Sequence, residues 1–190
     1  MTKVFIADVS KLNSDYSMYK DLVSDERYNN LCKLKRDEDV RLSLGVELLL
    51  ADYLGRKPRY YIDEHGKPQG EKIHFNFSHS GTVAVCAVSD NPVGVDVEKI
   101  RSVNIDIAKK KFCDEEYINI LSSKKPEETF FEYWVKKESY LKAEGKGIKA
   151  GLDSFNVDKV DDYKFYMYNI DGYKICVCSS EKPIFYEKSL

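Results

Sequence analysis

The chain has 190 residues, 43% of them hydrophobic and 33% charged, a composition that excludes a disordered chain and favours a folded globular protein. This length is sufficient to bury a core without disulfide or metal staples. The formal net charge of −2 excludes a global electrostatic attraction to nucleic acid or to an anionic membrane, so an anion site has to come from a local cluster of cations.

The first half of the chain is predicted to contain a strand, several helices and a small sheet. Residues 3–9 are rich in β-branched and aromatic side chains and indicate a strand, and helices are expected at 15–23 and 25–35. The clearest helix is 36–54, because apolar residues recur at helical spacing and Gly55 suits the position after a helix end. Four short strands are then expected, at 60–62, 73–79, 82–89 and 93–98.

The second half repeats this order. Helices are expected near 105–111 and 114–121, and a long helix is expected from about Pro126 to Glu144, because proline and acidic residues suit the first turn. Strands are predicted near 155–160, 164–170 and 173–179. Helices followed by a small sheet in each half predict an α+β fold rather than an alternating βαβ series.

The cysteines and the hydropathy pattern favour an intracellular setting. No apolar run is long enough to span a membrane, and the first residues are too mixed for a secretory signal, so a cytoplasmic location is expected. The five cysteines form no CxxC pair and are predicted to be reduced core thiols.

Two carboxylates share one face of the strand predicted at 93–98. The alternate valines are expected to point into the core, so Gly94, Asp96 and Glu98 point together to the other side. Neighbouring carboxylates repel each other, and a hard divalent cation with oxygen ligands resolves that conflict. The alternative is a solvated strand face with lysines such as Lys99 nearby, and the pair taken alone favours this alternative.

A third carboxylate lies on the long helix. Trp134, Glu138 and Lys142 are four residues apart and share one helix face. Glu138 could complete a three-carboxylate metal site, and Lys137 and Lys142 could meet phosphates bound to that metal. The alternative is an ordinary amphipathic helix with a Glu–Lys pair.

Ser78 and His79 adjoin each other on the strand predicted at 73–79. Adjacent strand residues face opposite ways and no G-x-S-x-G motif is present, so a serine nucleophile with a histidine base is disfavoured. Contacts with a phosphate suit them better. Of the cations in the first half, Lys67 has a defined direction because Gly66 and Pro68 flank it; the others are expected to be solvated when taken singly, and are Lys33, Lys35, Arg36 and Arg41.

Four motifs in this order resemble the 4′-phosphopantetheinyl transferase superfamily. They are Gly66-Lys67-Pro68, Phe75-Asn76-Phe77-Ser78-His79-Ser80, Val93-Gly94-Val95-Asp96-Val97-Glu98, and Trp134 with Lys137-Glu138-Ser139 and Lys142. The chain is similar to the larger, surfactin-synthetase-activating type, which looks like a fused pseudo-dimer. The resemblance implies an α+β fold with an N-terminal half (1–92) and a C-terminal half (93–190), packed as one compact unit with the active site between them, and a monomer.

The resemblance also implies an activity. The chain is expected to transfer 4′-phosphopantetheine from coenzyme A, a co-substrate, to a serine of an apo acyl or peptidyl carrier protein, releasing adenosine 3′,5′-bisphosphate. The expected metal is Mg²⁺, with Mn²⁺ as a substitute, held by Asp96, Glu98 and Glu138. Glu138 and Lys142 are the expected catalytic residues, one accepting the serine proton and the other contacting the pyrophosphate. The residues expected to bind coenzyme A are Arg41, Lys67, Ser78, His79, Lys137 and Lys142.

Two other classes of function remain as alternatives. One is a catalytically silent module that binds coenzyme A or a carrier protein, although simple binding does not require three metal ligands. The other is nucleic-acid binding through the basic helices, which the net charge and the lack of a recognisable motif disfavour. Neither nucleic acid nor membrane is therefore expected among the partners.

Overall fold

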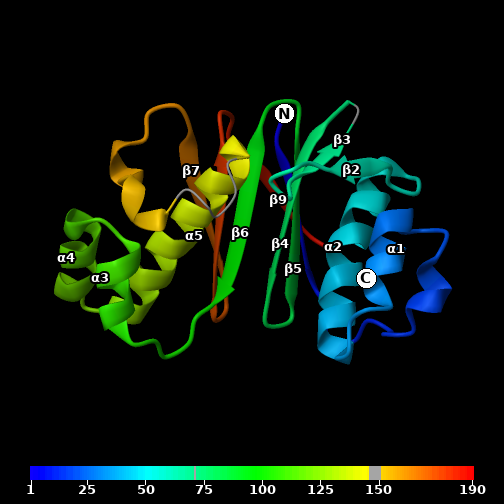
Figure 1. Ribbon diagram of the computed structural model, residues 1–190, viewed down its shortest axis with the longest axis horizontal. Coiled ribbons are helices and arrows are strands. Elements are labelled where there is room, and N and C mark those ends of the chain that lie inside the picture. Colours follow the sequence, from blue (N-terminus) through cyan, green and yellow to red (C-terminus); the bar gives the residue numbers. More distant parts are fainter. Residues whose placement is uncertain (71, 146–150) are drawn as a thin grey trace.

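Two sheets lie side by side at the centre of the molecule, and helices cover each of them (Figure 1). The computed structural model describes residues 1–70, 72–145 and 151–190. The first sheet has the strand order β4-β5-β1-β9 and the second has the order β6-β8-β7, while β2 and β3 form a separate hairpin. The strands are β1 (Lys3–Asp8), β2 (Tyr60–Ile62), β3 (Pro68–Gly70), β4 (His74–Ser80), β5 (Val83–Ser89), β6 (Val93–Lys99), β7 (Lys164–Ile170), β8 (Tyr173–Ser179) and β9 (Ile184–Glu187).

The α-helices pack on the two sheets from opposite sides (Figure 1). Helix α2 lies on the first sheet and α5 lies on the second, so the α+β order predicted from the sequence is confirmed. The helices are α1 (Asp25–Leu31), α2 (Asp37–Leu54), α3 (Ala108–Lys111), α4 (Asp114–Ser122) and α5 (Pro126–Glu144). In the described part of the chain, no helix has both the length and the apolar character needed to cross a bilayer.

The two long helices begin and end close to where the sequence predicts. Helix α2 starts with three acidic residues, which suit the positive end of the helix dipole, and is followed by Gly55 with a left-handed φ of 62°. Helix α5 carries Pro126 in its first turn and is followed by Gly145, whose φ is 71°. These signals place Glu138 and Lys142 in the last two turns of α5.

Three local predictions are wrong, and in two of them a short polar side chain bonds to the nearby backbone and competes with regular structure. The helix expected at 15–23 is only a 3₁₀ turn, Tyr16–Tyr19, next to Asp15, whose side chain accepts the Ser17 N–H at 3.2 Å. The helix expected at 25–35 ends at Leu31. The strand expected at 155–160 is replaced by a 3₁₀ turn in which the Asn156 side chain accepts the Asp158 N–H at 2.9 Å.

Three hydrophobic clusters form the interior. The first lies between α1, α2 and one face of the first sheet, and the third surrounds α4 and α5. The second fills the space between the two sheets, where Val93, Val95 and Val97 of β6 meet Val4 and Ile6 of β1. The predicted alternation along β6 is therefore confirmed, and its other face is turned to α5.

Strands β4 and β6 lie side by side, but side chains rather than a backbone ladder join them (Figure 1). The Val95 N–H donates to Oδ1 of Asn76 at 3.0 Å. The next two alternate amides of β6 donate in the same way to hydroxyls of β4, Val97 N–H to Ser78 Oγ at 3.2 Å and Lys99 N–H to Ser80 Oγ at 3.1 Å. This β4–β6 seam joins the two sheets through polar side chains, and it lies next to the carboxylates of β6.

The chain returns to the first sheet at its last strand. Strand β9 pairs in parallel with β1, with Ile184 opposite Lys3 and Glu187 opposite Ile6. The sequence does not predict this strand, because it is a four-residue run without a clear alternation. Its partner, the free edge of β1, supplies the hydrogen bonds that stabilise it.

Candidate active site

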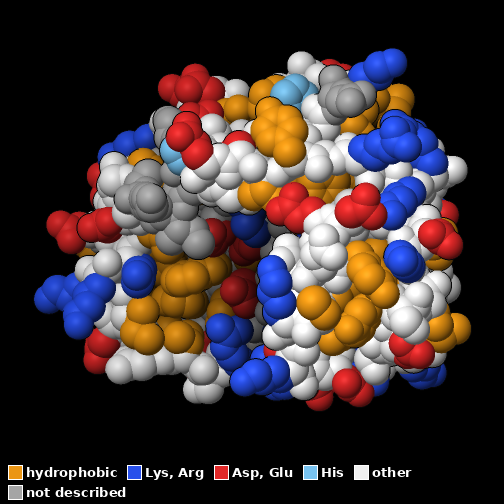
Figure 2. Space-filling view, turned by 45° about the vertical axis from the view of Figure 1, so that its right-hand side comes forward, with side chains coloured by type: hydrophobic (Ala, Val, Ile, Leu, Met, Phe, Trp, Pro, Cys, Tyr) orange, Lys and Arg blue, Asp and Glu red, His pale blue; other side chains and the backbone are white. Residues whose placement is uncertain are grey.

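A cavity of about 630 Å³ opens where the β2–β3 hairpin, β4 and the end of α5 meet. Figure 2 shows the molecule hollowed near the centre of this face, with acidic side chains inside the hollow and cationic side chains around it. The residues that line the cavity come from both halves of the chain. They are Arg27, Ile62, Glu64, His65, Gly66, Lys67, Pro68, Asn76, Phe77, Glu138, Leu141, Lys142 and Gly145. The cavity therefore combines cations from the first half of the chain with a carboxylate and a lysine of α5.

Asp96 of β6 lies in the wall between β6, β4 and α5. Its Oδ1 accepts hydrogen bonds from the Lys142 ammonium at 2.7 Å and from the Ser78 hydroxyl at 2.8 Å. Its Oδ2 is buried and has no hydrogen-bond partner within the described residues. A buried carboxylate oxygen without a donor is costly, so Asp96 is set up to accept one more positive ligand.

Glu138 and Glu98 complete a group of three carboxylates with Asp96. Glu138 is one turn before Lys142 on α5 and lines the cavity. Burial raises its pKa, and the negative charges of Asp96 and Glu98 raise it further. Glu98 is half-buried, and its Oε2 accepts the Ser80 hydroxyl at 2.9 Å and the Arg101 guanidinium at 3.2 Å. The structure brings these three side chains into each other's electrostatic field, as the sequence predicts.

The chemistry of these three side chains indicates which kind of metal ion they can bind. Within residues 1–70, 72–145 and 151–190, no three histidine, cysteine or acidic side chains lie close enough together to form an assembled metal centre. The carboxylates nevertheless offer oxygen ligands only, one of which has no partner, and their mutual repulsion is relieved by a divalent cation. The residues therefore fit a hard ion such as Mg²⁺ or Mn²⁺ and do not suit a thiolate-binding metal.

Lys142 is the cation nearest to the carboxylates. Besides its ion pair with Asp96, its ammonium donates to the Ser78 hydroxyl at 3.2 Å and to the Val95 carbonyl at 3.1 Å. Because all three acceptors belong to β4 and β6, Lys142 is held at the β4–β6 seam while it lines the cavity. Ser78 is buried and bonds to Asp96, so it acts here by orienting that carboxylate.

Lys67 and Arg27 bring further positive charge to the cavity. The Lys67 ammonium donates to the Ala143 carbonyl near the end of α5 at 2.7 Å, and burial lowers its pKa. Arg27 lies in α1, and its guanidinium carbon is 5.6 Å from the centre of the Phe77 ring. The sequence does not reveal Arg27 as a site residue, because its position depends on contacts with β4 and α2 and no local motif marks it.

Four predicted coenzyme A contacts lie outside the cavity lining, and they are Ser78, His79, Arg41 and Lys137. His79 is exposed and shares a strand face with Phe77; partial desolvation of its ring by the surrounding groups and the cations Lys142 and Arg27 lower its pKa. The structure therefore places it beside the cavity rather than in it. Arg41 points elsewhere, since its Nε donates to the Leu12 carbonyl at 2.9 Å and its Nη2 is 3.8 Å from Asp37.

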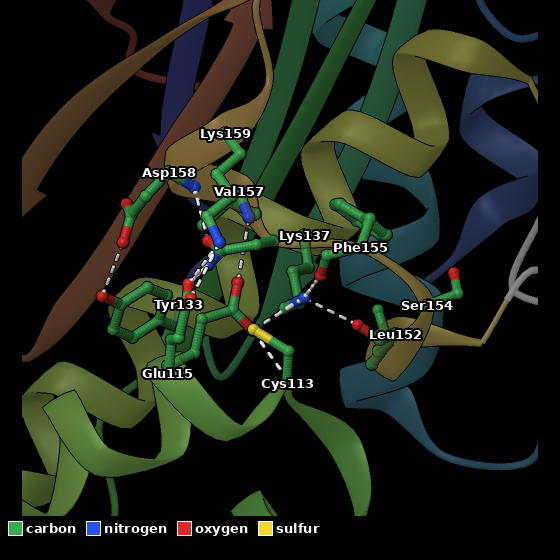
Figure 3. Close-up of polar contacts among 12 residues, drawn as sticks. Cys113, Glu115, Tyr133, Lys137, Leu152, Ser154, Phe155, Val157, Asp158 and Lys159 are labelled. Carbon is green, nitrogen blue, oxygen red and sulfur yellow. Dashed lines mark hydrogen bonds and ion pairs between the residues drawn. The ribbon is translucent and has the colours of Figure 1, made fainter.

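The position of Lys137 differs most from what was predicted, which is a contact with a phosphate. Its side chain is 0% exposed, and its ammonium forms an ion pair with the equally buried Glu116 at 2.8 Å. It also donates to the carbonyls of Leu152, at 2.7 Å, and Phe155, and Figure 3 shows it pointing into this cluster. Lys137 is one position before Glu138 on α5, and it faces α4 rather than the cavity. Lys137 is therefore a core residue that anchors the segment after α5.

Replacing Glu116 with alanine should lower the free energy of unfolding by about 3–5 kcal/mol, because it leaves the Lys137 ammonium buried without a counter-charge. Urea unfolding measures this loss. Glu115→Ala is the matched control: its ion pair with Lys159 is solvent-exposed, so that variant should unfold almost like the wild type. Equal midpoints for both variants would contradict the structural role of the Lys137–Glu116 pair.

The comparisons with known proteins identify the family of the chain. The family described as the 4′-phosphopantetheinyl transferase superfamily matches residues 92–187. The 4′-phosphopantetheinyl transferase Sfp of Bacillus subtilis strain 168 is 31% identical over 188 residues, which cover 85% of this chain and 84% of that protein. A second B. subtilis transferase, ffp, is 32% identical, with 87% and 85% covered. The transferase gsp of Aneurinibacillus migulanus is 39% identical, with 72% of this chain and 62% of that protein covered.

The chain therefore belongs to the 4′-phosphopantetheinyl transferase superfamily, and the resemblance seen in its motifs is confirmed. It is an enzyme of the transferase class.

Proposed function

We propose that the protein transfers 4′-phosphopantetheine from coenzyme A to a serine hydroxyl of an apo acyl or peptidyl carrier protein, and that adenosine 3′,5′-bisphosphate is released. The observation that carries this proposal is that Glu138 and Lys142, which is paired with Asp96, line one cavity together with Lys67 and Arg27. Phosphoryl transfer requires this combination, because it depends on positioning and on neutralising charge.

Asp96, Glu98 and Glu138 would hold the divalent cation, Mg²⁺ or Mn²⁺. When bound there, the ion would neutralise charge on the pyrophosphate of coenzyme A. Two observations support this assignment: Oδ2 of Asp96 is buried without a donor, and burial together with the neighbouring carboxylate charges raises the pKa of Glu138.

Lys142 and Glu138 would perform the chemistry. The serine oxygen forms a bond to the β-phosphorus, and the bond from that phosphorus to the bridging oxygen breaks. The electron pair stays on the α-phosphate of the departing nucleotide, where the Lys142 ammonium would stabilise it. Glu138 would accept the serine proton, directly or through a water.

Lys67 and Arg27 would bind the phosphate groups at the nucleotide end of coenzyme A, with His79 at the margin of the same site. Their ammonium and guanidinium groups are held by protein acceptors, so they are oriented before the ligand arrives. Ser78 would contribute indirectly through Asp96. Lys137 and Arg41 are not part of this proposed site.

We also propose that the molecule is a pseudo-dimer in one chain, with halves 1–92 and 93–190 on the two sides of the active site. Each side has helices packed on a sheet, and the β4–β6 seam joins them. Both walls of the cavity come from the same chain, so a monomer is sufficient for activity.

Mass spectrometry of several apo carrier proteins tests the proposal. After incubation with the protein, coenzyme A and Mg²⁺, a carrier should gain the mass of one phosphopantetheine group, and the reaction should stop when EDTA removes the metal. A carrier whose acceptor serine is replaced by alanine is the control and should stay unmodified. Binding of coenzyme A without a mass change on any carrier would instead support the silent binding module.

A further inference from the structure

A fully buried carboxylate lies behind the cavity and has no role in the chemistry above. Glu47 of α2 is 0% exposed, yet three donors from three parts of the first half reach it. Its Oε1 accepts the Ser24 N–H at 2.8 Å, and its Oε2 accepts the Tyr60 hydroxyl at 2.6 Å and the Arg27 Nε at 3.2 Å. Both oxygens are therefore satisfied, which is the condition for keeping such a charge inside a protein.

Glu47 determines where the Arg27 guanidinium points. With Nε on Glu47 and Nη1 on the Ser43 hydroxyl at 3.0 Å, the planar group is held at two of its nitrogens against α2. The Phe77 ring lies beneath it. Within the described residues Nη2 has no hydrogen-bond acceptor, and Arg27 lines the cavity, so the outer edge of the guanidinium remains for a ligand.

The same carboxylate also anchors the hairpin that carries Lys67. Tyr60 is in β2, which pairs with β3 on the other side of the Lys67 turn. The Tyr60 ring packs edge-on against Phe75 and Phe77 of β4, and its hydroxyl bond to Glu47 links the hairpin to α2. One buried group thus connects the two elements, α1 and the β2–β3 hairpin, that bring cations to this side of the cavity.

We propose that Glu47 is a positioning residue for substrate binding: it fixes the Arg27 guanidinium and the hairpin of Lys67 at the spacing that receives the phosphates of the donor. This rests on the proposed function, because the anion is taken to be coenzyme A. A merely structural Glu47 would affect folding only, whereas a positioning Glu47 affects the affinity for one of the two substrates.

Glu47→Gln tests the proposal, since glutamine keeps the shape and removes the charge that orients Arg27. The KM for coenzyme A, and its Kd measured by calorimetry without a carrier, should rise roughly 10- to 100-fold, the range expected for loss of one charge-assisted hydrogen bond. The kcat and the KM for the carrier should stay unchanged. Arg27→Ala should weaken binding similarly, and the double variant should lose less than the sum of the two single losses, because Glu47 acts in part through Arg27 and in part through the hairpin.

The control is Glu116→Gln, which alters a second fully buried glutamate, paired with Lys137 on the side of α5 that faces α4. It should lower the melting temperature and leave the KM for coenzyme A unchanged. If Glu47→Gln does not fold, Tyr60→Phe removes only the hydroxyl bond and should raise the same Kd to a smaller extent. Unchanged coenzyme A binding in a folded Glu47 or Tyr60 variant would overturn the inference. A wild type that binds no coenzyme A would contradict the proposed function itself.

Discussion

Replacing Glu138 with glutamine is expected to reduce kcat for phosphopantetheine transfer by about 10²- to 10³-fold, the usual loss when one charge-stabilising group is removed from a transition state. The same substitution is expected to raise the melting temperature in the absence of metal. Loss of activity together with a gain in stability is the mark of a residue kept for chemistry at a cost to folding.

The direction of the stability change follows from the pKa of Glu138. Because burial and the neighbouring carboxylates raise that pKa in the folded protein, the stability it contributes at low pH is lost as the pH rises through its folded value. At neutral pH the carboxylate therefore destabilises the fold, and a neutral glutamine removes that effect. Mg²⁺ should do the same in the wild type, raising its melting temperature, and should do so much less in the variant.

Glu132→Gln is the matched control on the same helix. Glu132 pairs with Lys136 at the surface, away from the cavity, so this variant should keep both its kcat and its response to Mg²⁺. A Glu138→Gln enzyme with near-normal turnover at saturating Mg²⁺ would remove Glu138 from the chemistry. An Mg²⁺ response equal in wild type and variant would remove it from the metal site.

A single added methyl group at Gly94 is expected to be nearly as damaging. The Cβ of an alanine there would lie 2.0 Å from the Ser139 carbonyl oxygen and 2.5 Å from the Ala143 nitrogen, both backbone atoms of α5. The helix would have to move off β6, so the free energy of unfolding should fall by about 3 kcal/mol, the upper end for overpacking. Because Glu138 and Lys142 move with α5, kcat should also fall roughly 100-fold. Urea unfolding and the transfer assay measure the two effects.

Gly45→Ala is the control that distinguishes a clash with backbone atoms from a clash with a side chain that can move. Its Cβ would lie 2.4 Å from the Val9 Cγ1, which is a side-chain atom and can shift, and alanine in a helix interior gains about 1 kcal/mol over glycine. This variant should therefore lose much less stability than Gly94→Ala and keep its activity. Similar losses at both positions would show that α5 adapts to β6 more easily than the close contact implies.

The parts of the fold that the sequence predicts are those with strong local signals. The long helices have terminal glycines and acidic first turns, and strands β6 to β8 have alternating or uniformly apolar runs. The strand β9 has no such signal, because its stability comes from the edge of β1, far away in the sequence. The segment 155–160 contains enough apolar residues for a strand, but the side chain of Asn156 favours a turn.

The candidate site, like the fold, has a part that the sequence predicts and a part that it does not. Spacing along a strand and a helix predicts which side chains share a face, and the structure brings Asp96, Glu138 and Lys142 together accordingly. The spacing of residues does not predict which other element packs on a given face. Lys137 lies next to Glu138 in the motif but is covered by α4, and Arg27, without a motif, reaches the cavity because Glu47 and Phe77 hold it there.

The pairing of β9 with β1 has a consequence for how the protein is made. The 175 residues that separate Asp8 from Ile184 have to be synthesised before β1 can gain its second neighbour. At a ribosomal rate of about 5 to 20 residues per second, the edge of β1 waits roughly 9 to 35 s with its backbone N–H and C=O groups unpaired. An open strand edge is a template for pairing with another chain. Nascent chains on one messenger, or chains that end before Ile184, are therefore expected to associate through β1, and a chaperone that shields this edge should raise the yield of folded protein.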